Sequence, residues 1–169
     1  DNFDYIVSLT SPRIQMYLKK ISVNIIENIQ EIRVRVNKPI VIVTHSGCSF
    51  LTSSGKLSYI FSSNCIYTTE NEIKDTINKM CGYSMHSHYE DLLNGYVTLP
   101  DGARVGLVGT AVFEKDKIKG IKDFTCINIR IPRNITGISE NIMNNVFKNG
   151  PEDLLIAGAP SSGKTTLLK

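Results

Sequence analysis

The sequence predicts a mixed α+β domain, with helices and an antiparallel sheet, followed by the beginning of a second, α/β domain. Three observations support this fold class. Apolar residues recur at helical spacing near the N-terminus and again at 69–93, β-branched runs separated by turns fill 31–44 and 96–131, and a wholly apolar run at 154–157 follows Asn149-Gly150-Pro151. The expected domains are therefore 1–150 and 151–169.

The first predicted element is helical. Apolar residues at three- and four-residue spacing between 11 and 29 predict one amphipathic helix or two short ones. They are Ile14, Tyr17, Leu18, Ile21, Ile25 and Ile29.

Strands follow this helical segment. Residues 31–36 alternate between polar and aliphatic side chains, which places Arg33 and Arg35 on one face of a strand and the aliphatic residues on the other. The turn 37–39 leads into a β-branched run at 40–44. Residues 45–64, rich in Ser and Gly, are typical of hairpins and loops.

A second helical region begins near residue 69. Thr69 or Asn71 can cap it, Ile73, Ile77 and Met80 form its apolar stripe, and residue 82 is a glycine suited to a helix end. A short helix over 85–93 is expected next.

The following stretch predicts a meander of antiparallel strands. Its expected strands are 96–99, 104–113, 118–121 and 126–131, with turns at 100–102 and 115–117. A helix over 139–147 should come next, and the apolar run 154–157 should form a strand buried on both faces of a parallel sheet.

The pattern G-x-x-x-x-G-K-[ST] directly follows that run. Glycines at its two ends permit positive φ, so that successive backbone N–H groups can surround phosphate oxygens at a helix N-terminus. We predict that this loop binds ATP, and the alternative is a Gly-Ser turn with a structural role only. The predicted nucleotide-binding residues are Gly158, Ala159, Pro160, Ser161, Ser162, Gly163, Lys164, Thr165 and Thr166.

Three side chains of the loop have distinct expected roles. Lys164 reaches the β- and γ-phosphates, the Thr165 hydroxyl coordinates Mg²⁺, and Thr166 contacts the α-phosphate. Phosphoryl transfer also needs a second acidic Mg²⁺ ligand and a group that orients water, which normally lie downstream of such a loop. We therefore expect this chain to be the front part of a larger ATPase and to be inactive by itself.

Four stretches before the loop resemble a known family. They are 31–39 (EIRVRVNKP), 95–100 (GYVTLP), 104–109 (RVGLVG) and 128–133 (NIRIPR). With the loop they resemble the stage III sporulation protein AA family of endospore-forming bacteria, over nearly the whole chain. This family is similar to the hexameric secretion and pilus ATPases, which implies an N-terminal α+β domain joined to a RecA-like core.

The resemblance also implies a mechanism and partners. ATP would be bound between subunits of a homo-oligomeric, hexameric ring, and an arginine of the N-terminal domain or a neighbour would neutralise charge developing on the γ-phosphate. By position the candidates are Arg104, Arg130 and Arg133, with surface ion pairing as the alternative for each. The expected partners are membrane proteins of the channel between mother cell and forespore, and the expected location is the mother-cell cytoplasm, attached to the membrane through those partners.

Charge and composition separate this hypothesis from two others. The net charge of +3 is small and spread along the chain, so no nucleic acid partner is expected. A P-loop nucleic-acid translocase remains an alternative, and so does a docking module that nucleotide merely switches. Arg33 and Arg35 are either solvated or face an acidic partner.

Other reactive side chains predict no separate site. His86 and His88 lack a third metal ligand at the usual spacing, and neighbouring acids such as Glu90 and Asp91 do not converge on one substrate. The cysteines at 48, 65, 81 and 126 form no C-x-x-C pair, so a reduced, structural role is expected.

Overall fold

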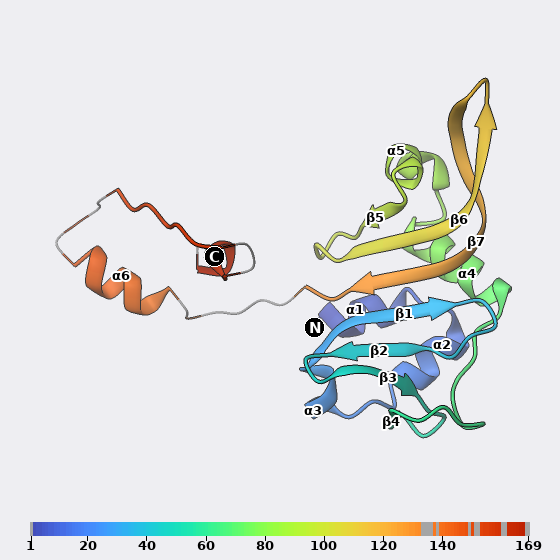
Figure 1. Cartoon of the computed structure of the whole chain (residues 1–169), viewed down its shortest axis with the longest axis horizontal. Helices are drawn as coiled ribbons and strands as arrows, with labels where there is room; N and C mark the ends of the chain where they lie inside the picture. The colour runs from blue at the N-terminus through green and yellow to red at the C-terminus, as the bar shows by residue number, and fades with distance from the viewer. Residues whose placement is uncertain are drawn as a thin grey trace. The chain divides into compact units, whose positions relative to one another are not determined.

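The computed structural model describes residues 2–132, 137, 139–148, 150, 153–159 and 162–167 (Figure 1). The chain divides into two compact units, Asp1–Pro132 and Arg133–Lys169, which are described separately. The first unit ends at the last strand of the sheet. The helix over 140–146 belongs to the second unit, although the sequence placed it before a boundary near 150.

Three short helices open the first unit. They are α1 (Asn2–Ser8), α2 (Pro12–Leu18) and α3 (Val23–Ile26). The predicted helical segment 11–29 is thus two short helices, and α1 was not predicted. Ser11 and Pro12 begin α2 because proline fits the first helical position, where no intrahelical N–H bond is lost. The buried side chains of α1 and α2 join the core.

A single antiparallel sheet contains all strands of the described residues. Its order is β4-β3-β2-β1-β7-β6-β5. The bounds are β1 Ile29–Arg35, β2 Val41–Thr44, β3 Gly47–Leu51, β4 Leu57–Ser58, β5 Tyr96–Thr98, β6 Arg104–Glu114 and β7 Lys117–Arg130. Two consecutive meanders, β1–β4 and β5–β7, are joined side by side through the pairing of β1 with β7. The expected antiparallel sheet is confirmed.

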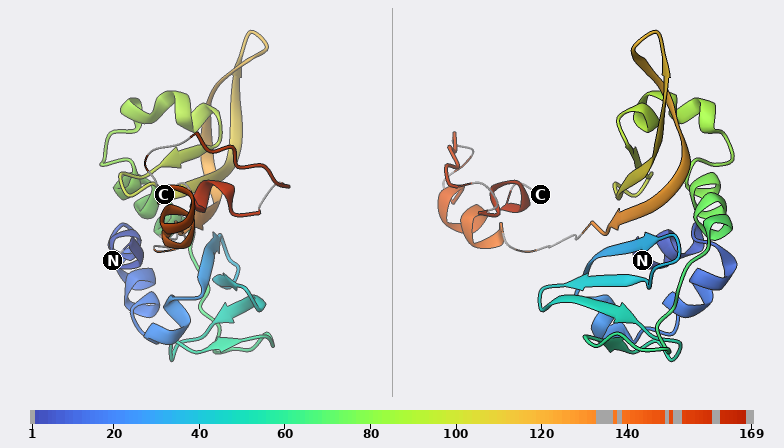
Figure 2. Two further views of the ribbon diagram at one scale, coloured as in Figure 1. Left: turned by 90° about the vertical axis from the view of Figure 1, so that its left-hand side faces the viewer. Right: turned by 45° about the vertical axis from the view of Figure 1, so that its right-hand side comes forward.

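One face of this sheet is covered by helices and the other is open (Figure 2). The alternation predicted for β1 distinguishes the core face from the open face. Ile32 and Val34 are buried in the core, whereas Arg33 and Arg35 lie on the open face. The strands β4 and β5 form the two edges of the sheet, and both are very short.

The two meanders are linked by α4 (Glu70–Met80), a 3₁₀ turn η1 (Met85–His88) and α5 (Tyr89–Leu93). Thr69 caps α4 as predicted. Its hydroxyl accepts a bond from the Glu72 backbone N–H at 3.3 Å, and the Glu72 carboxylate accepts one from the Thr69 backbone N–H at 2.8 Å. Ile73, Ile77 and Met80 are buried, as expected from their spacing.

The β6–β7 hairpin extends beyond the rest of the sheet (Figure 1). The two strands predicted at 118–121 and 126–131 form one strand, β7, because the ladder continues past an irregularity between Val108 and Thr110. Asp123 has φ of 49° at this irregularity. At the tip, Lys115 and Asp116 both have positive φ, at 47° and 63°, which is the geometry of a tight hairpin turn.

The second unit contains α6 (Glu140–Val146) and α7 (Lys164–Leu167). The predicted helix over 139–147 is confirmed. No helix among the described residues is long and apolar enough to cross a membrane.

Candidate functional site

In the predicted phosphate-binding loop, the ammonium group of Lys164 contacts described residues on both sides of the loop. Its Nζ donates hydrogen bonds to the carbonyl oxygens of Gly158 at 2.8 Å and Ala159 at 2.6 Å, and lies 3.5 Å from Ser162 Oγ. The first and last parts of the loop are therefore held around one positive charge. A group with phosphate oxygens would compete with these carbonyls for the same ammonium.

Of the two glycines expected to allow positive φ in the loop, Gly163 adopts it and Gly158 does not. Gly163 has φ of +87°, which non-glycine residues rarely adopt. The helix α7 begins directly after it, and the Leu167 N–H donates to the Gly163 carbonyl at 2.9 Å. A turn that ends in a glycine and opens into a helix suits phosphate binding, because the first N–H groups of a helix have no partner within the helix.

Several predicted loop residues lie outside the described part of the chain. Pro160 and Ser161 are not among the described residues, and the side chains of Thr165 and Thr166 are likewise not described. Their roles toward Mg²⁺ and the α-phosphate stay predictions.

The strand expected before the loop is not formed, so this prediction was wrong for the chain as it stands. Residues 153–159 have no regular secondary structure, and Leu155 is 91% exposed. A β-strand needs a neighbour that satisfies its N–H and C=O groups, and none of the described strands pairs with this segment.

Two of the three candidate arginines lie next to each other. Arg104 on β6 is directly opposite Arg130 on β7, and both are exposed on the open face of the sheet. Within the described residues neither side chain has an ion-pair partner. Like charges directly opposite each other destabilise a sheet, so this pair is a candidate anion site. Arg133 lies outside the described residues.

The arginine pair borders a shallow hollow of about 240 Å³. Its other lining residues are Glu31, Tyr96, Gly106 and Asn128. These residues were not predicted for the site. The alternation along each strand could have indicated Asn128, because it lies two positions before Arg130 and hence on the same face. No sequence pattern indicates that β1 brings Glu31 opposite Arg130.

Glu31 is already engaged by a different arginine. Its carboxylate accepts bonds from Arg33 Nε at 3.0 Å and Nη2 at 3.3 Å. The hydrogen bond to Glu31 is the main cause that raises the pKa of Arg33, against the opposing effect of burial. The Glu31 carboxylate is therefore paired with Arg33 and does not neutralise Arg104 or Arg130, so the cluster formed by Arg33, Arg104, Arg130 and Glu31 keeps a net positive charge.

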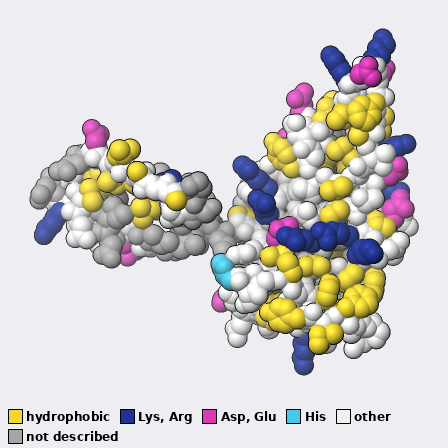
Figure 3. Space-filling view, in the orientation of Figure 1, with side chains coloured by type: hydrophobic (Ala, Val, Ile, Leu, Met, Phe, Trp, Pro, Cys, Tyr) yellow, Lys and Arg dark blue, Asp and Glu magenta, His cyan; other side chains and the backbone are white. Residues whose placement is uncertain are grey.

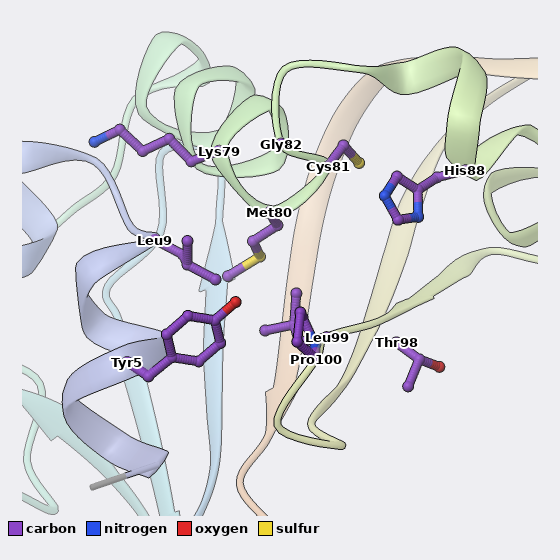
Figure 4. A pocket seen from close by; sticks show the side chains of 10 residues that line it. All are labelled: Tyr5, Leu9, Lys79, Met80, Cys81, Gly82, His88, Thr98, Leu99 and Pro100. Carbon is purple, nitrogen blue, oxygen red and sulfur yellow. The ribbon is translucent and has the colours of Figure 1, made fainter.

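A second, larger hollow of about 450 Å³ lies between α1, the end of α4 and the turn after β5 (Figure 4). Its lining is mostly apolar. Burial raises the pKa of the Cys81 thiol, with a smaller contribution from Asp91, so this cysteine stays a neutral thiol rather than a nucleophile. Lys79 bonds the carbonyl of Thr10 at 3.0 Å. Neither Cys81 nor Lys79 is therefore free to act as a nucleophile or base in this hollow.

Comparison with known proteins decides the family. A family model described as sporulation stage III, protein AA, matches residues 1–169. The chain belongs to this family. Stage III sporulation protein AA of Bacillus subtilis (strain 168) is 33% identical over 141 residues, which cover 83% of this chain and 42% of that protein. The chain thus spans less than half the length of this curated relative.

One solved structure shows a limited similarity to this chain. The X-ray structure of the Legionella pneumophila ATPase DotB aligns with 91% of this chain and 38% of that chain, with 21% sequence identity and a TM-score of 0.41. A TM-score this low does not establish a shared fold. The family membership therefore rests on the sequence match.

Proposed function

We propose that this chain is the N-terminal part of a secretion-type ATPase that acts in sporulation. The observation that carries the proposal is the loop from Gly158 to Thr165, in which the lysine ammonium donates to the carbonyls of Gly158 and Ala159 and Gly163 has a positive φ. Family membership adds the sporulation context. The rest of a RecA-like core would complete the nucleotide site.

The loop residues fit a nucleotide's terminal phosphates. Among the described residues, the positive charge of Lys164 contacts uncharged carbonyl and hydroxyl oxygens, so a phosphate oxygen is a stronger acceptor for it. Thr165 is the residue that would hold Mg²⁺, and the metal would neutralise charge on the β- and γ-phosphates.

The arginine pair supports a catalytic role for the N-terminal unit. Arg104 and Arg130 lie side by side without carboxylate partners in the described part of the chain, and an anion between them would relieve their mutual repulsion. In the proposed ring, one of these arginines or Arg133 stabilises the γ-phosphate in the transition state, from the same subunit or from a neighbour.

Hydrolysis would drive assembly of, or transport through, the channel complex between mother cell and forespore. The proposed partners are further copies of the protein in a hexameric ring and membrane proteins of that complex, in the mother-cell cytoplasm. The ring brings each nucleotide within reach of a second subunit's arginines, which a monomer cannot do.

The test is binding and hydrolysis of Mg·ATP by the complete protein that contains this chain. Calorimetry should show saturable binding, and Lys164→Ala should abolish both binding and steady-state hydrolysis. Lys79→Ala is a matched control, since it also removes a lysine whose Nζ bonds a backbone carbonyl. Wild-type hydrolysis by the Lys164→Ala protein would refute the proposal.

A further inference from the structure

The segment between Glu31 and Glu70 contains no Asp or Glu, although it includes Arg33, Arg35, Lys38 and Lys56. Acidic residues are otherwise distributed along the chain, whose net charge is +3. This acid-free segment forms the second half of β1, all of β2, β3 and β4, and the loops that join them. The corresponding end of the sheet is therefore positively charged and attracts an anionic partner.

The same segment exposes three consecutive large side chains. Tyr59, Ile60 and Phe61 follow β4 and are 68%, 77% and 58% exposed. Their loop has a defined conformation, because Ser58 Oγ donates to the Ile60 carbonyl at 2.8 Å and accepts from the Ile60 N–H at 3.1 Å. The conformation of the loop therefore keeps these three side chains exposed.

The exposed aromatic residues continue onto the open face of the sheet. The Phe61 ring packs edge-on against Phe50 and against Tyr67, with ring centroids 6.0 Å apart in each pair. Phe50 lies opposite Val41, which itself lies opposite Arg33. Figure 3 shows hydrophobic side chains gathered over these strands beside a band of Lys and Arg.

Cations border the aromatic cluster on its other side. Arg13 Nη2 donates to the Tyr67 carbonyl, and Pro39, next to Lys38, is bridged to Tyr67. Arg13 is paired with Glu72 and Arg33 with Glu31. In contrast, Arg35, Lys38 and Lys56 have no ion-pair partner among the described residues. We call residues Arg35, Lys38, Phe50, Tyr59, Ile60, Phe61 and Tyr67 the aromatic–basic surface.

We propose that the aromatic–basic surface binds the surface of a lipid bilayer that contains anionic lipids. Tyr59, Ile60 and Phe61 enter the boundary between headgroups and acyl chains, where aromatic side chains are favoured. Arg35 and Lys38 attract the anionic headgroups, an effect that falls off within a Debye length.

The shape and chemistry of the loop favour a bilayer over an acidic protein segment. Three neighbouring residues on one loop expose more than half of each side chain, so a rigid partner would need a matching cavity, whereas a fluid interface adapts to them. Weak apolar insertion and a cationic patch also complement each other, since either signal alone gives only marginal attachment.

The hairpin tip provides an internal contrast. Phe113 and Ile118 lie opposite each other and are 64% and 47% exposed. Two acids, Glu114 and Asp116, alternate there with three lysines at 115, 117 and 119, so the tip has a net charge of +1, against +4 for the four cations of the acid-free segment. The tip is therefore a matched region that exposes apolar side chains but attracts anionic headgroups more weakly, and we do not expect it to insert into such a bilayer.

The first experiment is sedimentation of the 169-residue chain with lipid vesicles. The chain should bind vesicles of equal parts phosphatidylcholine and phosphatidylglycerol, and should not bind phosphatidylcholine alone. Replacing Tyr59, Ile60 and Phe61 together by serine should weaken binding about tenfold or more, and Arg35→Gln or Lys38→Gln roughly fivefold each. The Phe113→Ser/Ile118→Ser protein should bind like wild type.

Two results would overturn the proposal. One is the absence of binding to both kinds of vesicle, which would leave an acidic protein as the partner of this surface. The other is equal binding by the wild-type chain and the triple serine variant, with far-UV circular dichroism confirming that both are folded. Lys164→Ala should not change vesicle binding, so this outcome is independent of the nucleotide site.

A second experiment places a reporter on the surface. The chain contains no tryptophan, so Phe61→Trp and Phe113→Trp each give a single fluorophore. Anionic vesicles should shift the emission of Trp at position 61 to the blue and leave that at position 113 unchanged. No shift at position 61, or the same shift at both positions, would contradict insertion by the loop.

Discussion

Ile32, in a stretch that alternates polar and aliphatic residues, is fully buried in the sheet of the N-terminal unit, whereas Leu155, in a wholly apolar stretch of the C-terminal unit, is 91% exposed. Both lie in runs that the sequence assigned to strands. The difference is the presence of partners, because β1 pairs with β2 on one side and β7 on the other, while residues 153–159 pair with none of the described strands. An apolar run thus becomes a strand only where neighbours satisfy its backbone.

The largest expected effect is a loss of ATP hydrolysis when an arginine of the N-terminal unit is replaced. Changing Arg104 or Arg130 to Ala in the complete protein should lower kcat for ATP hydrolysis by the order of 10³-fold if that residue acts as an arginine finger. The stability of the N-terminal unit should not fall, since each change removes one of two opposed cations. Steady-state hydrolysis and thermal unfolding measure the two effects.

A mixing experiment tells whether such an arginine acts on a neighbouring subunit. An inactive Arg130→Ala protein mixed with an inactive Lys164→Ala protein should regain part of the activity only if the arginine of one subunit serves the loop of another. Wild-type rates in Arg104→Ala, Arg130→Ala and Arg133→Ala proteins would refute the catalytic assignment.

The next largest effect concerns the contrast between these two segments, both of which the sequence assigned to strands. Ile32→Ala should destabilise the chain by about 2–5 kcal/mol, because it leaves a cavity in a packed core. Leu155→Ala should change stability by no more than about 0.5 kcal/mol, as is usual for exposed positions. Urea unfolding of both variants gives the comparison, and a similar loss in both would mean that Leu155 is packed in solution.

A smaller effect is expected in the β6–β7 hairpin. A methyl group at Gly109 would lie 2.6 Å from the Lys122 carbonyl oxygen and 3.2 Å from Phe124 Cα, both rigid backbone atoms. Gly109→Ala should therefore cost about 1–3 kcal/mol through overpacking. Gly120 is the matched control in the paired strand, because a methyl group there would meet nothing within 4 Å and its alanine variant should unfold like wild type.

The smallest effect depends on pH. Burial of Glu72 opposes its ionisation, but hydrogen bonds from Arg13 and Thr69 outweigh this and lower the pKa of the carboxyl. Folding therefore favours the ionised form, so the stabilisation is complete above the ordinary pKa and is lost as pH falls through the lower, folded-state pKa. Glu72→Gln should cost about 1 kcal/mol at neutral pH.

The corresponding measurement is urea unfolding of wild type and Glu72→Gln over a range of pH. The difference between them should shrink as the medium becomes acidic, and Glu70→Gln serves as the control because its ion pair with Lys74 is exposed. A difference that is constant with pH would show that the Glu72 charge contributes nothing.

Local patterns predicted much of the N-terminal unit. The alternation of β1, and the cap and apolar stripe of α4, depend on residues a few positions apart, and both were confirmed. The continuity of β7 was missed because the sequence around Asp123 resembles a break between strands. In the ladder this residue only distorts the strand, with φ of 49°.

The arginine hollow shows where such prediction ends. The sequence singled out Arg104 and Arg130, but their contact arises from strand register, which depends on pairing between distant segments. Glu31 and Tyr96 come from two further strands, so no spacing along the chain predicts them. The loop at 158–165 could be predicted from the sequence, because all the residues expected to bind phosphate lie within one short segment.

The two outermost strands of the sheet are its shortest, with two residues in β4 and three in β5. Each margin thus presents few free amide and carbonyl groups to a passing extended polypeptide. Another molecule can gain little by adding a strand of its own there. Other proteins should accordingly bind this unit through side chains on its faces and loops. Substitutions change the affinity of such side-chain contacts more easily than that of a row of main-chain hydrogen bonds.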